Sequence, residues 1–274
     1  MAEQQSIQSV DAAMRLLQVL AATNRAMTLK EISAAVGMTA SNTHRYMVSF
    51  MRASLVCQES DSGRYDLGPF ALHLGLAAMG RLDPVTVATK LMMELRARID
   101  LAVSLSIWTP DGPTMIRWLD SSHPLTVNIK PGSRTPLLNS ASGRVFLSFE
   151  PQEKLKTVLA AELRVRRSRK ETAWTTMEEV NALRAEVRRH GLGRVRGDRV
   201  SGVNGLSAPI FDAAGELALT ISTIGLEYAF DASYNGAVAI ALRDAAARAS
   251  AQLGFNAQRH GVLGLRQGDK AQAA

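Results

Sequence analysis

The stretch "LKEISAAVGMTASNTHRYMVSFMRASLV" (29–56) contains two helical patterns of apolar residues with a break between them at "GMTAS". Thr28 and the glutamate three residues after it form the capping-box pattern that starts a helix. Gly37 is well placed to end this helix, because helix ends commonly need a positive φ. Thr39 or Ser41 can cap the second helix. The break therefore predicts two helices set at an angle to each other.

The second helix has two unlike faces when its residues are projected at about 100° each. Its core side holds Thr43, Tyr46, Met47 and Phe50. Its opposite side carries hydrogen-bonding groups and arginine but no carboxylate: Ser41, Asn42, Arg45, Ser49 and Arg52, with His44 at the edge. A phosphate-lined groove requires such a face, since a carboxylate there would be repelled. Arginine also suits the guanine edge and asparagine the adenine edge.

The segment after this helix, "LVCQESDSGRYDLG" (55–68), has the pattern of a strand, a turn and a second strand. An amphipathic helix over 7–22 precedes the two central helices. Residues 1–68 therefore predict a winged helix-turn-helix whose third helix enters a DNA major groove. A three-helix protein-interaction module is the alternative. The residues predicted to contact DNA are Thr28, Thr39, Ser41, Asn42, Thr43, His44, Arg45, Ser49, Arg52 and Arg64.

Bulk composition sets limits on the class of protein. With 46% hydrophobic and 21% charged residues, the chain of 274 residues has an ordinary globular composition, long enough for two domains. One cysteine, Cys57, excludes a disulfide framework and any multi-cysteine metal cluster. The N-terminus lacks a signal-peptide pattern, and the longest apolar stretch is too short to span a bilayer. We therefore expect a soluble cytoplasmic protein without a membrane partner.

The net charge of +7 invites a nucleic-acid interpretation, but its distribution does not support one directly. Residues 1–80 hold six basic and six acidic side chains, so the surplus lies further along the chain. Part of it is the run "LRVRRSRK" (163–170), for which a solvated surface is the ordinary explanation. The case for DNA binding therefore depends on the local geometry of the third helix.

The segment "GPFALHLGLAAMG" (68–80) is apolar on almost every side, so it must be buried against something. We expect a linker helix over 69–83 that pairs with the same helix of a second subunit. Packing within one chain is the alternative.

The remaining sequence predicts an α+β domain over 84–257 with an antiparallel sheet flanked by helices. A stripe of Val87, Leu91, Leu95 and Ile99 indicates its first helix. Strands are expected at 101–108, 114–120 and 125–130, a capped helix at 176–191, a hairpin at 206–222 and a last helix near 233–253. The tail, 258–274, is expected to be disordered.

The stretch "RTPLLNSASGRVFLSF" (134–149) is the strongest candidate for a ligand site in this domain. Small residues at its helix start leave the first-turn N–H groups open to a carboxylate or phosphate. The residues concerned are Asn139, Ser140, Ala141, Ser142 and Gly143. A plain N-cap with tight packing of the helix against a sheet is the alternative.

The blocks 28–56, 62–75, 128–148 and 202–222 together resemble the IclR family of bacterial transcription regulators. The resemblance rests on the helix-turn-helix, "THR" at 43–45, "YDLG" at 65–68, "NIKPGSRTPLLNSASGRVFLS" and "GVNGLSAPIFDAAGELALTIS". It implies a GAF-like effector-binding domain, a homodimer that pairs into a dimer of dimers, and an effector cavity beside 139–143.

The resemblance also indicates further cavity walls. Members that bind glyoxylate- or pyruvate-like acids tend to place an acidic residue, a cysteine and two serines there. The corresponding positions here are Val195, Gly205, Ser222 and Ile224, so three of the four polar groups are missing. This composition favours an aromatic or longer carboxylate, whose charge could pair with Arg194 or Arg196. The "SxGR" pattern also resembles regulators of aromatic-acid catabolism.

Other function classes find little support in the sequence. The five histidines are scattered without metal-ligand spacing, no nucleophile-elbow pattern occurs, and "GLGRVRG" (191–197) does not open a helix after a strand. We therefore expect no enzyme, metal or cofactor. The sequence predicts a ligand-responsive regulator of a catabolic operon that binds a palindromic operator of double-stranded DNA. A small-molecule-processing enzyme and an assembly factor with an N-terminal protein-interaction module are the alternatives.

Overall fold

The computed structural model describes residues 6–23, 25–122, 130–171, 173–198 and 201–257. The chain divides into two separately packed units, Met1–Leu82 and Asp83–Ala274. The domain limits that the sequence suggests at residues 68 and 83 stay predictions.

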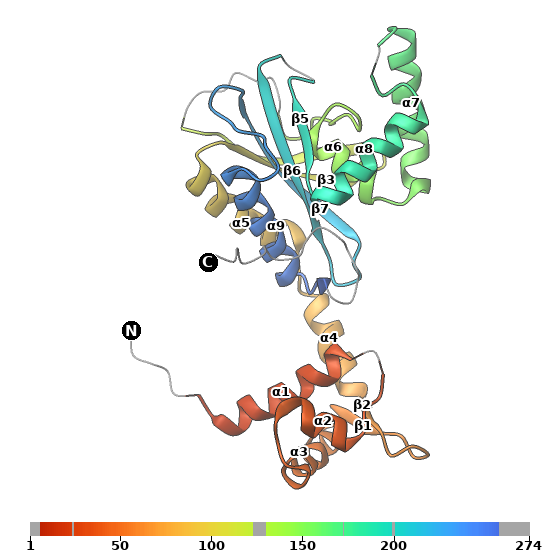
Figure 1. Ribbon diagram of the computed structural model, residues 1–274, viewed down its shortest axis with the longest axis vertical. Helices are drawn as coiled ribbons and strands as arrows, with labels where there is room; N and C mark the ends of the chain where they lie inside the picture. Colours follow the sequence, from red (N-terminus) through yellow and green to blue (C-terminus); the bar gives the residue numbers. More distant parts are fainter. Residues whose placement is uncertain (1–5, 24, 123–129, 172, 199–200, 258–274) are drawn as a thin grey trace, which may run out of the picture. The chain divides into compact units, whose positions relative to one another are not determined.

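The N-terminal unit is a winged helix-turn-helix (Figure 1). Its elements are α1 (Gln8–Ala22), α2 (Leu29–Val36), α3 (Ala40–Arg52), β1 (Val56–Gln58), β2 (Tyr65–Leu67) and α4 (Pro69–Met79). The capping box at Thr28 is present, and Gly37 ends α2 in the left-handed region at φ 68°. Of the two possible caps of α3, Thr39 is the one used, because its hydroxyl accepts the Asn42 N–H at 3.3 Å.

The core of this unit lies between the three helices and the hairpin. Its buried side chains are Leu16, Leu20, Met27, Ile32, Met47, Phe50, Val56 and Tyr65. β1 and β2 pair antiparallel, and Met27 exchanges backbone hydrogen bonds of 2.9 and 2.7 Å with Tyr65. The hairpin is therefore tied directly to the chain that enters α2.

α4 differs from the other helices because none of its residues is buried. Large apolar side chains are exposed along it: Phe70, Leu72, Leu74, Leu76 and Met79. The helix ends at Met79, four residues before the expected end of the linker.

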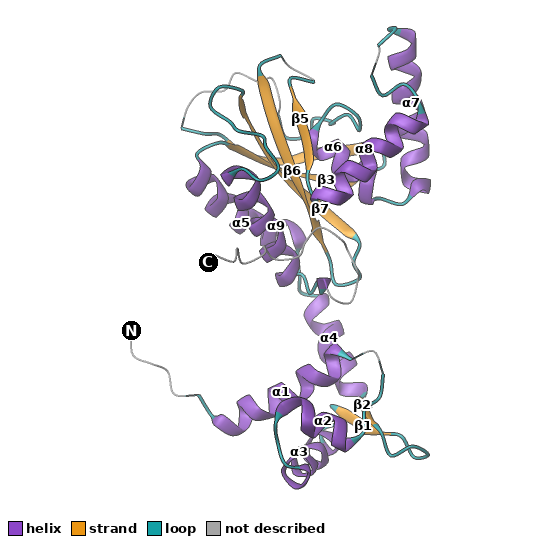
Figure 2. Ribbon diagram, in the orientation of Figure 1, coloured by secondary structure: helices purple, strands orange, loops and turns teal. Residues whose placement is uncertain are grey.

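The C-terminal unit is an α+β domain, as the sequence predicts. Its elements are α5 (Pro84–Ile99), β3 (Ala102–Thr109), β4 (Gly112–Leu119), α6 (Ala141–Phe149), α7 (Gln152–Ser168), α8 (Met177–His190), β5 (Gly193–Arg196), β6 (Val203–Phe211), β7 (Leu217–Leu226) and α9 (Ala237–Gln252). The strands form one antiparallel sheet in the order β4-β3-β7-β6-β5. α5 and α9 lie on one side of the sheet and α6 and α8 on the other (Figure 2).

The two faces of the sheet have different chemistry because side chains alternate along each strand. In β3, Val103 and Leu105 join the apolar core formed with α5 and α9. Ser104 and Ser106 point to the opposite face and line a cavity there together with residues of α6. The alternation in "LAVSLSIW" therefore sets a polar sheet surface beneath α6.

Several elements differ from the sequence-based expectations. α7 and β5 were not predicted: 163–170 is the end of a helix whose leucines, at 155, 159 and 163, face the core. The last helix begins at Ala237 rather than near residue 233. The third strand expected at 125–130 and the tail at 258–274 lie outside the described residues, apart from Lys130, which is in no strand.

No helix in the described part of the chain is long and apolar enough to cross a membrane. The same residues contain no group of three or more His, Cys, Asp or Glu that could hold a metal ion.

Candidate functional site

The outer face of α3 is exposed and carries no carboxylate. Its exposed residues are Ser41, Asn42, His44, Arg45, Ser49 and Arg52. Thr43, Met47 and Phe50 are buried on the other side of the helix. The side chains of α3 therefore divide between core and solvent as its periodicity predicts.

Three of the ten predicted DNA-contacting residues are threonines with local structural roles. Thr43 is fully buried at 0% exposure, so its hydroxyl cannot meet a groove. Thr28 accepts the Glu31 N–H at 3.3 Å and donates to the Glu31 carboxylate at 2.9 Å. Thr39 caps α3 by accepting an N–H, but it is exposed and its O–H can still donate, so its predicted contact with DNA stays a prediction.

Arg64, predicted to contact DNA from the hairpin, is paired inside its own unit. Its Nη1 lies 3.4 Å from Glu31 Oε2, and Arg25 Nη2 lies 2.8 Å from Glu31 Oε1. The hydrogen bond from Arg25, then those from Thr28, lower the pKa of Glu31 to about 2. This pairing engages the Nη1 of Arg64, and its side chain stays 39% exposed.

The C-terminal unit holds a cavity between α6 and the polar face of the sheet. Its lining combines hydroxyl and amide groups with apolar walls: Ser104, Ser106, Met115, Trp118, Thr135, Asn139, Ser140, Ala141, Ser142, Val195, Val203, Gly205, Ser222, Thr223 and Ile224. No Asp, Glu, Lys, Arg or His stands among these residues. The described residues of the cavity can therefore bind a polar group by hydrogen bonds.

The start of α6 forms one wall of this cavity. The Ser140 hydroxyl accepts the Gly143 N–H at 2.9 Å and donates to the Pro136 carbonyl at 2.6 Å, so it is a true N-cap. The N–H groups of Ala141 and Ser142 have no acceptor among the described residues. Two N–H groups at the positive end of the helix dipole are thus open to an anion.

Gly143 lies outside the lining and serves packing. A Cβ built on it would lie 1.8 Å from the Pro136 carbonyl oxygen and 2.7 Å from the Ser140 hydroxyl. Any larger residue would collide with backbone, so only glycine fits. The N-cap alternative therefore explains Ser140 and Gly143, while Ala141 and Ser142 remain candidates for ligand binding.

The polar side chains of the cavity differ in whether they have partners. The Ser222 hydroxyl donates to Ser207 at 2.8 Å, and the Ser142 hydroxyl donates to Thr135 at 3.3 Å. Asn139 Oδ1 is buried without any hydrogen-bond donor in the described part of the chain. A buried acceptor without a donor is costly, so this oxygen indicates where a ligand donor would sit.

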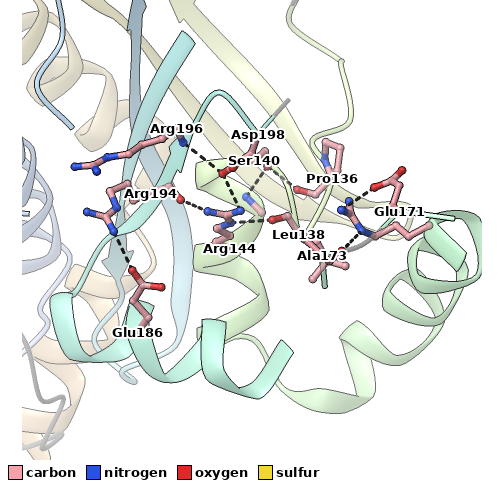
Figure 3. Close-up of polar contacts among 12 residues, drawn as sticks. Pro136, Leu138, Ser140, Arg144, Glu171, Ala173, Glu186, Arg194, Arg196 and Asp198 are labelled. Atoms are coloured by element: carbon pink, nitrogen blue, oxygen red, sulfur yellow. Dashed lines mark hydrogen bonds and ion pairs between the residues drawn. The ribbon is translucent and has the colours of Figure 1, made fainter. Parts of the chain in front are cut away.

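Arg194 and Arg196, predicted to pair with an effector, lie outside the cavity lining. They flank Val195 in β5, so the alternation of the strand turns them to the other face. The Arg194 guanidinium stands 4.0 Å over the Tyr234 ring and pairs with Glu186 at 3.2 Å. Figure 3 shows both arginines extending away from Ser140. The prediction failed because β5 itself was not recognised.

A buried arginine that the sequence analysis does not single out connects the parts of this wall. Arg144, 5% exposed, donates from Nε to the Leu138 carbonyl at 2.8 Å and pairs with Asp198 at 2.9 Å (Figure 3). Another of its nitrogens bonds the Arg194 carbonyl. Burial lowers the pKa of this guanidinium, and Asp198 opposes the effect. Arg144 thereby ties the segment before α6 to β5; the "SGR" motif is the signal that could have identified it.

Comparisons with known proteins find matches over both parts of the chain. A family model for the IclR helix-turn-helix domain matches residues 9–60, and one for the bacterial transcriptional regulator IclR C-terminal domain matches 76–251. The regulator KdgR of Escherichia coli K12 is 26% identical over 251 residues, which cover 92% of this chain and 94% of KdgR.

Solved structures agree as well. The crystal structure of Pseudomonas aeruginosa HmgR is 29% identical with a TM-score of 0.83, covering 91% of this chain and 99% of HmgR. An IclR homologue from Microbacterium hydrocarbonoxydans, complexed with 4-hydroxybenzoate, is 19% identical with a TM-score of 0.52 and coverage of 89% and 98%. At that identity the second likeness concerns the fold alone.

Proposed function

The chain belongs to the IclR family of bacterial transcriptional regulators, and on this premise we propose that it controls a catabolic operon in response to a small organic carboxylate. As a family member it is a ligand-responsive, DNA-binding transcriptional regulator. The observation that carries the finer proposal is the uncharged cavity beneath α6, with two open N–H groups and an unpaired amide oxygen.

α3 is the element that we assign to the operator. Arg45 and Asn42 are exposed on its carboxylate-free face and carry the donor and acceptor groups that recognise guanine and adenine edges. Ser41, Ser49 and Arg52 lie on the same exposed side and would hold phosphates. Thr43 leaves the list of contacts because it is buried, and Thr28 because its hydroxyl already accepts from and donates to Glu31. Thr39 is exposed and stays on the list, since its O–H can donate to a phosphate.

A homodimer would present two copies of α3 to a palindromic operator. The exposed apolar side chains of α4 support this assembly, because a helix with such a surface is unstable in water unless it is covered. Two such dimers on adjacent half-sites would make the dimer of dimers.

The effector that suits the cavity is a hydroxylated aromatic carboxylate. Its carboxylate would accept the N–H groups of Ala141 and Ser142, and its ring would contact Trp118 and Met115. A ligand hydroxyl would supply the donor that Asn139 Oδ1 lacks. The complex of a homologue with 4-hydroxybenzoate makes this compound the first probe to use.

Titration of the purified protein tests both parts of the proposal. We expect it to prefer a duplex from its own upstream region over random DNA at moderate salt, and to change this affinity when 4-hydroxybenzoate is added. Calorimetry should give tighter binding for 4-hydroxybenzoate than for pyruvate. Absence of any sequence preference would refute the operator assignment, and tighter binding of pyruvate would refute the effector class.

A further inference from the structure

A run of positive charge on α7 and just after it is not used by the proposed function. Between residues 154 and 170 there are seven Lys and Arg against one Asp or Glu; α7 itself carries five Lys and Arg against two Glu, a net +3, while the whole chain carries +7. Residues 1–82 hold seven basic and six acidic side chains, a net +1. The unit that reads DNA therefore contributes little net attraction to phosphate.

Most of the basic side chains of α7 are exposed, whereas one of its two glutamates is turned inward. Its leucines at 155, 159 and 163 pack in the cluster that includes α6 and α8, on the far side of these helices from the sheet (Figure 1). Glu162 is turned inward, where its carboxylate accepts the Leu137 N–H at 2.8 Å and the Leu138 N–H at 3.0 Å. Burial raises the pKa of Glu162, while the hydrogen bonds from the Leu138 and Leu137 N–H groups oppose the effect.

The negative charge of Glu171, just after α7, is paired with an arginine of the same helix. It pairs at 2.7 Å with Arg166, a buried arginine that also donates to the Ala173 carbonyl (Figure 3). Glu153, in the first turn, is the one exposed carboxylate of α7. The exposed cations from 154 to 170 are Lys154, Lys156, Arg164, Arg167, Arg169 and Lys170.

Three of these cations form a stripe along the helix, which we call the α7 stripe: Lys156, Arg164 and Arg167. At about 100° per residue they lie within about 80° of one another, and at 1.5 Å per residue they span about 16 Å. Lys156 and Arg164 have no carboxylate partner in the part of the chain that the structure describes. The Arg167 guanidinium donates to the Thr175 carbonyl at 2.8 and 2.9 Å.

Helix stability does not explain this pattern. Cations favour the last turn of a helix, where Arg167 lies, but they are unfavourable near the first turn. Lys154, at the start of α7, is compensated by Glu150 at 3.0 Å, whereas Lys156 forms no ion pair among the described residues. Glu153, three residues before Lys156, is the one exposed carboxylate on this side of α7. The cations further along the stripe therefore repel one another unless an anion joins them.

We infer that the α7 stripe is a second DNA-binding surface, which binds the phosphate backbone of double-stranded DNA without regard to sequence. DNA is the polyanion that this regulator meets, so this step rests on the proposed function. The stripe supplies the electrostatic attraction that the nearly neutral N-terminal unit lacks. An acidic protein surface is the other partner that such charges fit, and the test below separates the two.

The test compares two full-length variants with equal loss of charge. Lys156→Gln/Arg164→Gln removes two charges from the stripe, and Lys90→Gln/Arg117→Gln removes two exposed charges elsewhere in the same unit. Anisotropy titrations with a random-sequence duplex are run over a series of salt concentrations. Each phosphate contact contributes about 0.9 to the slope of log K against log salt. We expect the magnitude of this slope to be smaller by about one to two for the stripe variant than for the wild type, and unchanged for the control variant.

Equal slopes for the two variants would overturn the inference. Wild-type DNA binding by the stripe variant, combined with loss of regulated transcription by purified RNA polymerase, would also overturn it in favour of an acidic protein partner. Random DNA probes the stripe, while preference for the upstream duplex probes α3. Failure of one proposal is therefore distinguishable from failure of the other.

Discussion

α3 and α6 begin alike in sequence but end in opposite environments. Each starts at a hydroxyl N-cap, Thr39 or Ser140, followed by small or polar residues. α3 keeps one face in solvent, whereas residues 141–148 of α6 are all buried. In a half-exposed helix, the spacing of apolar residues in the sequence shows which side chains face solvent and can bind a partner. In a helix buried on all sides the sequence has no such spacing, so only the structure shows which of its groups reach a cavity.

The largest loss of stability is expected at Gly143 of α6, where the backbone leaves no space for a side chain. Gly143→Ala should destabilise the C-terminal unit by about 3 kcal/mol or more, because the new methyl group meets the Pro136 carbonyl. Thermal unfolding followed by circular dichroism measures this. Gly75→Ala on exposed α4, where nothing lies within 4 Å, is the matched control and should be neutral or stabilising by up to about 1 kcal/mol. Equal melting temperatures for the two variants would contradict the close approach.

The next effect concerns binding by α3. Arg45→Ala should weaken operator binding by about 1–3 kcal/mol and reduce discrimination at the base pair it contacts. Since the side chain is exposed, the free energy of unfolding should change by no more than about 0.5 kcal/mol. Titration of operator and random duplexes checks the first statement and urea unfolding the second. Unchanged operator affinity would remove α3 from the DNA interface.

Smaller changes in stability are expected for two threonines at the start of α3. Thr39→Val removes the N-cap and should cost about 1 kcal/mol. Thr43→Val removes a buried hydroxyl that has no partner in the described residues, and should stabilise the protein by up to about 1 kcal/mol. Urea unfolding of both variants gives the two signs. A loss of stability in Thr43→Val would mean that its hydroxyl is paired after all.

The smallest expected effect is electrostatic and concerns Glu31, beneath the hairpin. Its pKa lies at about 2 in the folded protein, below the usual 4.5, chiefly because Arg25 donates to it. A depressed carboxyl pKa stabilises the fold above pH 4.5, and this contribution is lost as the pH falls toward 2. NMR titration of the Glu31 side chain should show the low value, and Arg25→Ala should raise it more than Arg64→Ala. Titration near 4.5 in the wild type would contradict the pairing.

The errors at the effector cavity share a physical cause. Arg194 and Arg196 were selected as charges near the cavity, but a strand turns alternate residues to opposite faces, and β5 was not recognised as a strand. Ser104 and Ser106 were visible only as the polar half of an alternating strand. Nothing in that pattern shows that α6 covers them. Trp118 and Met115 reach the same cavity from β4 through strand pairing.

The sequence alone determined the elements that depend on local interactions. Capping groups, a left-handed glycine and one-sided periodicity specify α2, α3 and the exposed face around Arg45, because these features involve residues within a few positions of one another. Tertiary structure alone decided which polar groups are buried or hydrogen-bonded within the protein and which remain available to a ligand. It buried Thr43, turned Glu162 inward beneath the α7 stripe, and left Asn139 Oδ1 without a donor among the described residues. Those outcomes depend on partners far along the chain, whose approach local pattern does not encode.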